Sequence, residues 1–301
     1  MKLFGKFSIG LKKKKKPEGI KAGEKGANNV KSAYALEMSQ IIDFKDKNGL
    51  DRAVQHVNYK GIKGAGEYLP VRVSEFDLLV DDGGLERGST ILLSGGAGTG
   101  KTTFAMQSLY EGCTAGERGI FISFEEEPEK IKKHMKKNYG WDFDVLEKNG
   151  LFAILKFDSL KLARGVEHMF FGKSDLDIKT QKLELPFVPD RIGIDSLSAL
   201  SIAFEDEENY RRYVKKLFDA LESTGAISFV IAETEQDPRI YSRSGVEEFL
   251  ADGVVVLYNL RQKLTRANAI EILKLRSSSH RKGLVMYAIR KGEGIVIDVP
   301  K

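Results

Sequence analysis

Apolar and polar positions alternate through the middle of the chain in a way that predicts strands and helices in turn. Short apolar runs typical of buried strands are separated by stretches with apolar residues at helical spacing. This alternation predicts an α/β fold, a mostly parallel sheet covered by helices on both faces. The expected strands are 90–94, 120–124, 151–157, 191–194 and 227–232, and the expected helices are 103–112, 128–139, 160–171 and 210–223.

The last quarter of the chain has a different pattern. Apolar strand-like runs follow one another with only short turns between them, which predicts a C-terminal antiparallel extension of the sheet. The expected strands are 254–258, 269–275, 284–289 and 294–299.

The first 65 residues do not share this pattern. Residues 1–29 are rich in Lys and Gly, and the lysine run 12–16 is followed by Pro17, a composition typical of disordered chain. Helices are expected at 30–44 and 50–57. The sequence therefore predicts a basic, partly disordered N-terminal extension with short helices, residues 1–65, and one α/β domain, residues 66–301.

Within that extension, residues 1–16 have a second reading. Leu3, Phe4, Phe7 and Leu11 lie at helical spacing among lysines. A short amphipathic helix here would dock on a protein partner or on an anionic membrane surface, which is the alternative to a solvated tail.

Composition and charge limit the classes of protein to consider. The chain has 301 residues, 42% hydrophobic and 30% charged, and its single cysteine, Cys113, rules out a disulfide framework. The lack of an apolar run of about 18 residues or of a signal peptide predicts a cytoplasmic protein. The net charge is +5, but residues 1–31 carry +8 and the remaining 270 residues carry −3. The domain therefore has no general attraction for nucleic acid, which is not favoured as a partner.

A glycine-rich motif joins the first predicted strand to the first predicted helix. Residues 95–102 read Gly-Gly-Ala-Gly-Thr-Gly-Lys-Thr and fit the phosphate-loop pattern, in which backbone N–H groups surround phosphate oxygens at a helix N-terminus. Lys101 would reach the terminal phosphates, and Thr102 would bind Mg²⁺. The residues expected to contact the nucleotide are Gly95, Gly96, Ala97, Gly98, Thr99, Gly100, Lys101, Thr102 and Thr103.

Two further strands end in carboxylates that suit hydrolysis. Asp195 follows the apolar run 191–194 and is the candidate Walker B residue, which would hold Mg²⁺ with Thr102. Glu125 and Glu126 follow another apolar strand, and we expect Glu125 to deprotonate water with Glu126 as its polar partner. The alternative is an acidic cluster that stabilises the N-terminus of the helix that starts at Pro128.

Five motifs in order resemble the KaiC family of the RecA superfamily, and more particularly its single-domain archaeal relatives. They are residues 95–102, Phe-Glu-Glu at 124–126, Ile-Asp-Ser-Leu-Ser at 194–198, Gly-Val-Glu-Glu-Phe at 245–249 with Asp252, and Lys-Leu-Arg-Ser-Ser-Ser-His at 274–280. The resemblance implies a RecA-like P-loop NTPase core, ATP with Mg²⁺, and a homo-oligomeric ring, commonly a hexamer. It further implies that Lys274, Arg276 and His280 reach the ATP of the neighbouring subunit, where the alternative is a solvated basic strand face.

The resemblance has limits. The circadian clock protein of that family has two ATPase domains in tandem. The phosphorylated Ser-Thr pair of its second domain corresponds here to Glu248 and Phe249, which excludes autophosphorylation of the clock type at these positions. We expect an ATP-hydrolysing regulatory ATPase that forms rings. The alternatives are a DNA-dependent recombination ATPase resembling RadA, with Arg239, Tyr241 and Arg243 in its second DNA loop, and a non-catalytic scaffold similar to the archaeal motility ATP-binding protein.

Overall fold

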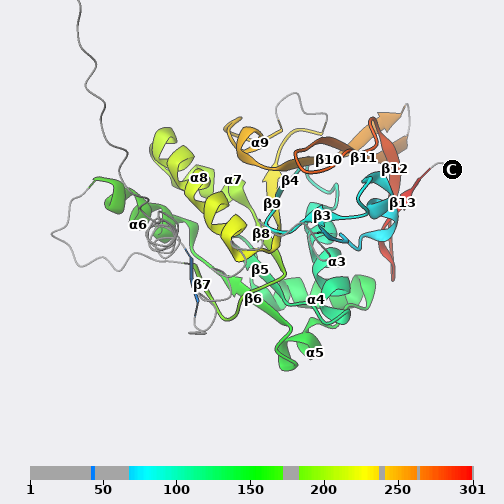
Figure 1. The fold of residues 1–301 in the computed structure, drawn as a ribbon, viewed down its shortest axis with the longest axis horizontal. Coiled ribbons are helices and arrows are strands. Elements are labelled where there is room, and N and C mark those ends of the chain that lie inside the picture. The colour runs from blue at the N-terminus through cyan, green and yellow to red at the C-terminus, as the bar shows by residue number, and fades with distance from the viewer. Residues whose placement is uncertain (1–41, 45–67, 172–182, 237–240, 263–264, 300–301) are drawn as a thin grey trace, which may run out of the picture.

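A sheet of nine strands runs through the centre of the protein (Figure 1). The computed structural model describes residues 42–44, 68–171, 183–236, 241–262 and 265–299. The strand order is β13-β12-β11-β10-β4-β9-β8-β5-β6, in which the neighbours from β10 to β6 pair parallel and those from β10 to β13 pair antiparallel. The strands are β4 (Thr90–Gly95), β5 (Gly119–Ser123), β6 (Phe152–Lys156), β8 (Arg191–Asp195), β9 (Ile227–Glu233), β10 (Gly253–Gln262), β11 (Thr265–Leu275), β12 (Val285–Arg290) and β13 (Gly294–Asp298).

Helices cover both faces of this sheet, as the sequence predicts (Figure 1). On one face lie α3 (Lys101–Thr114), α4 (Pro128–Tyr139) and α5 (Phe143–Lys148); on the other lie α6 (Ser159–Phe171), α7 (Leu197–Ala203) and α8 (Glu207–Thr224). The short α9 (Glu247–Leu250) precedes β10. Within the described residues, no helix combines the length and the apolarity needed to cross a membrane.

The two cores follow from the period of two along each strand. Leu92 of β4 is packed with the α6, α7 and α8 face, whereas its neighbours Ile91 and Leu93 are packed with the α3 face, and all three are almost fully buried. Strands that are apolar at every position are those of a parallel sheet buried on both sides. The mostly parallel α/β fold and the antiparallel C-terminal extension are therefore confirmed.

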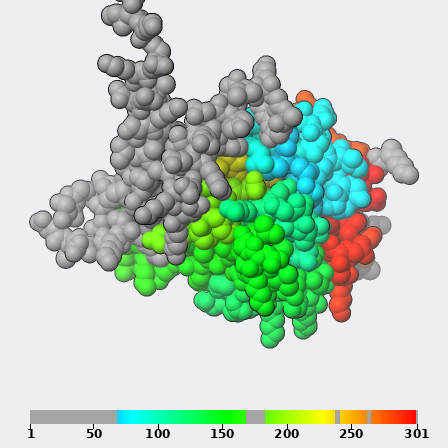
Figure 2. Space-filling view, turned by 60° about the horizontal axis from the view of Figure 1, so that its bottom comes forward, coloured from blue at the N-terminus to red at the C-terminus, as the bar shows by residue number. Residues whose placement is uncertain are grey.

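The segment before β4 packs across the end of the sheet. It contains β2 (Tyr68–Leu69), the 3-10 helix η1 (Ser74–Leu79) and β3 (Leu85–Glu86), and η1 lies against β13. Figure 2 shows this cyan segment beside the red C-terminal strands. The segment before β4 thus packs against β13, the last strand of the domain.

One predicted element differs from the structure. Residues 42–44, the end of the helix expected at 30–44, form the strand β1 (Ile42–Phe44), which pairs parallel with β7 (Leu183–Leu185). Ile and Phe suit a strand paired beside the buried Leu183 and Leu185, so tertiary pairing outweighs the local helical spacing. The rest of that helix, the helix at 50–57 and residues 1–16 lie outside the described residues.

Candidate functional site

The phosphate loop lies between β4, the middle strand of the nine-strand sheet, and α3. Gly95 leaves the strand with φ of 151°, and a Cβ there would lie 2.3 Å from the carbonyl oxygen of Leu257. Gly100 precedes the helix with φ of 91°, in the left-handed region that favours glycine. These two positions require glycine, and the helix that follows them begins at Lys101 with its N-terminus toward the loop.

Side chains inside the loop bond to its own backbone. Thr99 Oγ1 donates to the carbonyl of Gly96 at 2.9 Å, while Gly98 and Ala97 are exposed at the tip. Thr103, on the first turn of α3, has its hydroxyl 3.3 Å from that of Tyr139. The exposed tip is the part of the loop that a ligand would reach first.

Lys101 is buried with 6% of its surface exposed, although it carries the charge expected to bind phosphate. Its ammonium donates to the carbonyl oxygens of Gly95 and Gly96, both at 2.9 Å. Burial lowers the pKa of Lys101, and the carboxylates of Glu233, Asp195 and Glu125 oppose this effect. A buried cation whose hydrogen-bond partners, in the part of the chain that the structure describes, are carbonyl oxygens is well placed to transfer its bonds to an anionic ligand.

Thr102 and Asp195 meet as the sequence predicts for a magnesium site. Thr102 Oγ1 donates to Asp195 Oδ2 at 2.7 Å. The pKa of Asp195 is raised to about 6, mainly by burial and also by the charges of Glu125 and Glu233, while Thr102 and Lys101 act to lower it. A hydroxyl and a carboxylate beside a phosphate loop are the oxygen donors that Mg²⁺ prefers, so these residues fit the metal.

The two candidate catalytic glutamates point to different partners. Glu125 Oε1 accepts a hydrogen bond of 2.7 Å from Ser196, the residue after Asp195. Glu126 instead lies 3.5 Å from the ammonium of Lys130 on the first turns of α4. The geometry therefore places Glu125 next to the Thr102 and Asp195 pair, whereas Glu126 suits the helix N-terminal role considered above.

Three residues near the loop have no place among the residues expected from the sequence. Glu233 ends β9 directly beside Gly95, and it could have been found by the rule that identified Asp195, a carboxylate at the carboxyl end of an apolar strand. Gln236 donates from Nε2 to the carbonyl of Ala97 at 3.0 Å. Tyr287 donates its hydroxyl to the carbonyl of Thr99 at 2.5 Å from β12, and no local pattern marks it.

Arg276 lies at the opposite end of the strands from this loop, Lys274 lies two residues before it on β11, and His280 forms an isolated bridge with Val80. Arg276 N–H donates to the carbonyl of Asp252, and Asp252 N–H donates to that of Thr90, at the start of β4. The loop begins five residues further along β4, roughly 16 Å at about 3.3 Å per residue. Arg276 therefore does not meet the phosphate loop of its own chain. Lys274 is level with Leu92 through Val254, three residues or roughly 10 Å before the loop and two strands away from it.

The side chains of Lys274 and Arg276 are directed to α9, and that of His280 is directed to Lys282. Lys274 Nζ donates to the carbonyl of Glu248 at 2.9 Å, and Arg276 Nη2 donates to that of Phe249 at 2.8 Å. His280 Nε2 lies 2.9 Å from Lys282 Nζ. Burial, followed by the charge of Arg276, lowers the pKa of Lys274. Two cations thus converge on the carbonyl oxygens of one short helix, and Arg276 also pairs with the carboxylate of Asp252 at 3.6 Å.

Comparison with known proteins adds an independent finding. Residues 69–301 match the family described as "ATPase: KaiC". The chain is 36% identical over 234 residues to the circadian clock protein KaiC3 of Synechocystis, covering 77% of this chain and 45% of that protein. It is 35% identical over 231 residues to the circadian clock oscillator protein KaiC of Thermostichus vulcanus, covering 75% and 43%. The chain spans less than half the length of these two curated relatives.

A solved structure agrees with the sequence comparison. The KaiC-like protein PH0186 of the hyperthermophilic archaeon Pyrococcus horikoshii OT3 has a TM-score of 0.63 and 31% sequence identity, covering 77% of this chain and 99% of that chain. The likeness therefore extends over about three quarters of this chain and almost the whole of that chain.

Proposed function

The chain belongs to the KaiC family of ATPases, and from this premise we propose that it binds ATP with Mg²⁺ on the phosphate loop and hydrolyses it. We propose further that two neighbouring copies complete each site in a homo-oligomeric ring, a hexamer in the family reading. The relatives reported above are KaiC proteins, which favours this reading over a recombination ATPase resembling RadA.

Within one chain, the loop supplies the phosphate contacts. Its backbone N–H groups and Lys101 would hold the phosphates, and Thr102 with Asp195 would hold Mg²⁺, which when bound neutralises charge on the phosphoryl oxygens. Glu125 would take a proton from the attacking water, and Ser196 fixes the orientation of its carboxylate. Glu126, paired with Lys130, adds negative charge at the start of α4 and no direct chemistry.

The position of Lys274 and Arg276 carries the proposal of a shared site. Along the strand direction, Arg276 lies roughly 16 Å and Lys274 roughly 10 Å from the loop of their own chain, and β11 is two strands away from β4. A nucleotide that they contact must therefore belong to another copy. There their charge would stabilise the transferring phosphoryl group as an arginine finger does, with His280 beside them. Hydrolysis is the proposed reaction, because Glu248 and Phe249 offer no hydroxyl for autophosphorylation on α9.

Mixing two inactive variants tests the shared site. Lys101→Met removes the cation of the loop and keeps Lys274 and Arg276, whereas Arg276→Ala keeps the loop intact and removes the arginine that the neighbouring copy would supply. Each alone should lose ATP turnover, and Arg276→Ala should still bind ATP. In a ring assembled at random from equal amounts of the two variants, about a quarter of the interfaces join an intact loop, from Arg276→Ala, to an intact Arg276, from Lys101→Met. About a quarter of wild-type turnover should therefore return.

Arg290→Ala is the matched control, since Arg290 is an exposed arginine of the same sheet that pairs with Glu293 at 3.4 Å. It should keep wild-type turnover in the steady-state assay. An Arg276→Ala variant with wild-type turnover, or full activity in a protein that stays monomeric by light scattering with ATP, would contradict the shared site.

A further inference from the structure

The C-terminal strands β12 and β13 lie directly against the phosphate loop, although they are almost two hundred residues away in the chain. Tyr287 is 5% exposed, and its hydroxyl donates to the carbonyl oxygen of Thr99 at 2.5 Å. Thr99 is itself fully buried. The contact is therefore an interior one between a strand of the extension and the last turn of the loop.

The strands around Tyr287 are fixed to the loop and its helix by further contacts. Gln107 of α3 accepts from the N–H of Ile295 at 2.7 Å and donates to the carbonyl of the same residue at 3.2 Å. The side chains of Ile289 and Ile295 lie closest to the space where a Cβ of Gly100 would stand. The position of the Tyr287 ring relative to Thr99 is thus set by the fold before any ligand binds.

The geometry of the peptide bond turns this contact into a statement about phosphate binding. In a trans peptide unit the C=O and the N–H that follows point in opposite directions. Since the carbonyl of Thr99 points toward β12, the N–H of Gly100 points away from β12. A phosphate loop binds its ligand with such N–H groups, and a donor already fixed in direction costs less entropy on binding.

We propose that Tyr287 is a positioning residue for nucleotide binding, which holds the Thr99–Gly100 peptide unit so that its N–H faces the phosphates. This inference rests on the proposed function, because it concerns the same loop. Tyr287 does not touch the nucleotide, and burial raises the pKa of its phenol, so the hydroxyl remains a donor. Gln236 acts in the same sense on the carbonyl of Ala97.

The substitution Tyr287→Phe removes one hydroxyl and keeps the ring. Because the affected N–H contacts the phosphates equally before and during the reaction, we expect KM for Mg-ATP to rise and kcat to stay within about twofold. Loss of one hydrogen bond corresponds to a rise of roughly three- to tenfold in KM and in the Kd for Mg-ADP. Steady-state kinetics and isothermal calorimetry with Mg-ADP measure the two quantities.

Tyr258→Phe is the matched control. Tyr258 lies on β10 of the same sheet, is 6% exposed and donates its hydroxyl to Glu271 at 2.9 Å, but it packs in the opposite core. Both variants should lower the melting temperature by similar amounts, and only Tyr287→Phe should change KM and Kd. Equal nucleotide constants in the two variants would overturn the inference and leave the proposed function intact. A wild-type protein that binds neither Mg-ATP nor Mg-ADP would overturn the proposed function itself.

Discussion

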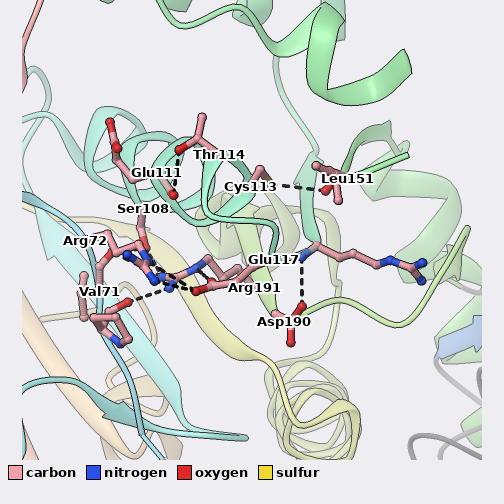
Figure 3. A network of polar contacts seen from close by, with 12 residues as sticks. Val71, Arg72, Ser108, Glu111, Cys113, Thr114, Glu117, Leu151, Asp190 and Arg191 are labelled. Carbon is pink, nitrogen blue, oxygen red and sulfur yellow. Dashed lines mark hydrogen bonds and ion pairs between the residues drawn. The ribbon is translucent and has the colours of Figure 1, made fainter. Parts of the chain in front are cut away.

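Two cations lie buried at opposite ends of the same core, Lys101 in the phosphate loop and Arg191 at the start of β8. Arg191 is fully buried and meets a carboxylate, Glu117, through its Nε. Its other nitrogens donate to the carbonyl of Pro70 at 2.6 Å, to that of Val71 at 3.3 Å and to Ser108 at 2.9 Å. Figure 3 shows Val71, Ser108 and Glu117, from three segments of the chain, around the side chain of Arg191.

Lys101 has a different kind of environment. Its two bonds go to carbonyls of its own loop, and no carboxylate is within ion-pair distance among the described residues. Burial lowers its pKa. The comparison teaches that Arg191 has the partners of a structural cation, which joins the segment before β4 to the core, whereas Lys101 has the partners of a cation that awaits an anion.

Removing Arg191 should have the largest effect. Arg191→Met leaves Glu117 with only Arg72 and removes the donor to the carbonyl of Pro70, so we expect a loss of about 3–5 kcal/mol in the free energy of unfolding. Urea denaturation followed by circular dichroism measures it. Arg87→Met, which breaks the more exposed pair with Asp190 at 3.1 Å, should cost less than about 1 kcal/mol. Equal losses in both variants would remove the distinction drawn for Arg191.

Removing Lys101 should affect turnover and leave the fold in place. In Lys101→Met the loop loses the charge expected to stabilise the phosphoryl group, so ATP turnover should fall by roughly 10²–10³-fold, or about 3–4 kcal/mol. The free energy of unfolding should stay within about 1 kcal/mol of wild type, because an apolar side chain replaces a buried cation without a carboxylate partner. A large loss of stability with retained turnover would assign Lys101 to the structural class.

The smallest expected effect is the pH dependence of stability that Asp195 contributes in protein free of nucleotide and Mg²⁺. Its folded pKa of about 6 lies above its ordinary value of 3.8, so between these values the folded protein binds more protons than the unfolded chain. The contribution of Asp195 to stability should therefore increase as pH falls from 7 to 4, by about 2 kcal/mol.

The difference in unfolding free energy between wild type and Asp195→Asn isolates this contribution from other carboxylates. Asn cannot titrate, so the difference should change across the pH range in favour of wild type at low pH. A difference that is constant from pH 4 to pH 7 would show that Asp195 has an ordinary pKa in the folded protein.

Periodicity predicts the strands and helices of the core because each carries its signal locally. Apolar runs mark the strands that are buried on both faces, and the glycine motif marks the loop whose backbone needs positive φ at Gly100. Short helices such as α5 and α7 were not predicted, because six or seven residues are too few to show a helical period.

The residues missed near the site are those whose role depends on distant contacts. Tyr287 lies 188 residues from Thr99, and Arg191 reads in the sequence only as a charged residue before an apolar strand. Only the pairing of strands brings β12 beside the loop, and only the segment at Pro70 and Val71 gives Arg191 its partners. The catalytic and neighbour-contact roles of Glu125, Lys274 and Arg276 remain predictions.

The two ends of the antiparallel extension have a consequence for symmetry. One end, at Tyr287, contacts the loop of its own chain, and the other, at Arg276, is partly exposed and bonds to the carbonyl of Phe249 at the far end of the strands. Under the proposed function, each copy accepts a finger through one surface and offers one through a different surface. A two-fold dimer built on one self-complementary patch could not pair them, so the assembly must be heterologous, head to tail, and every site is filled only when a cycle closes.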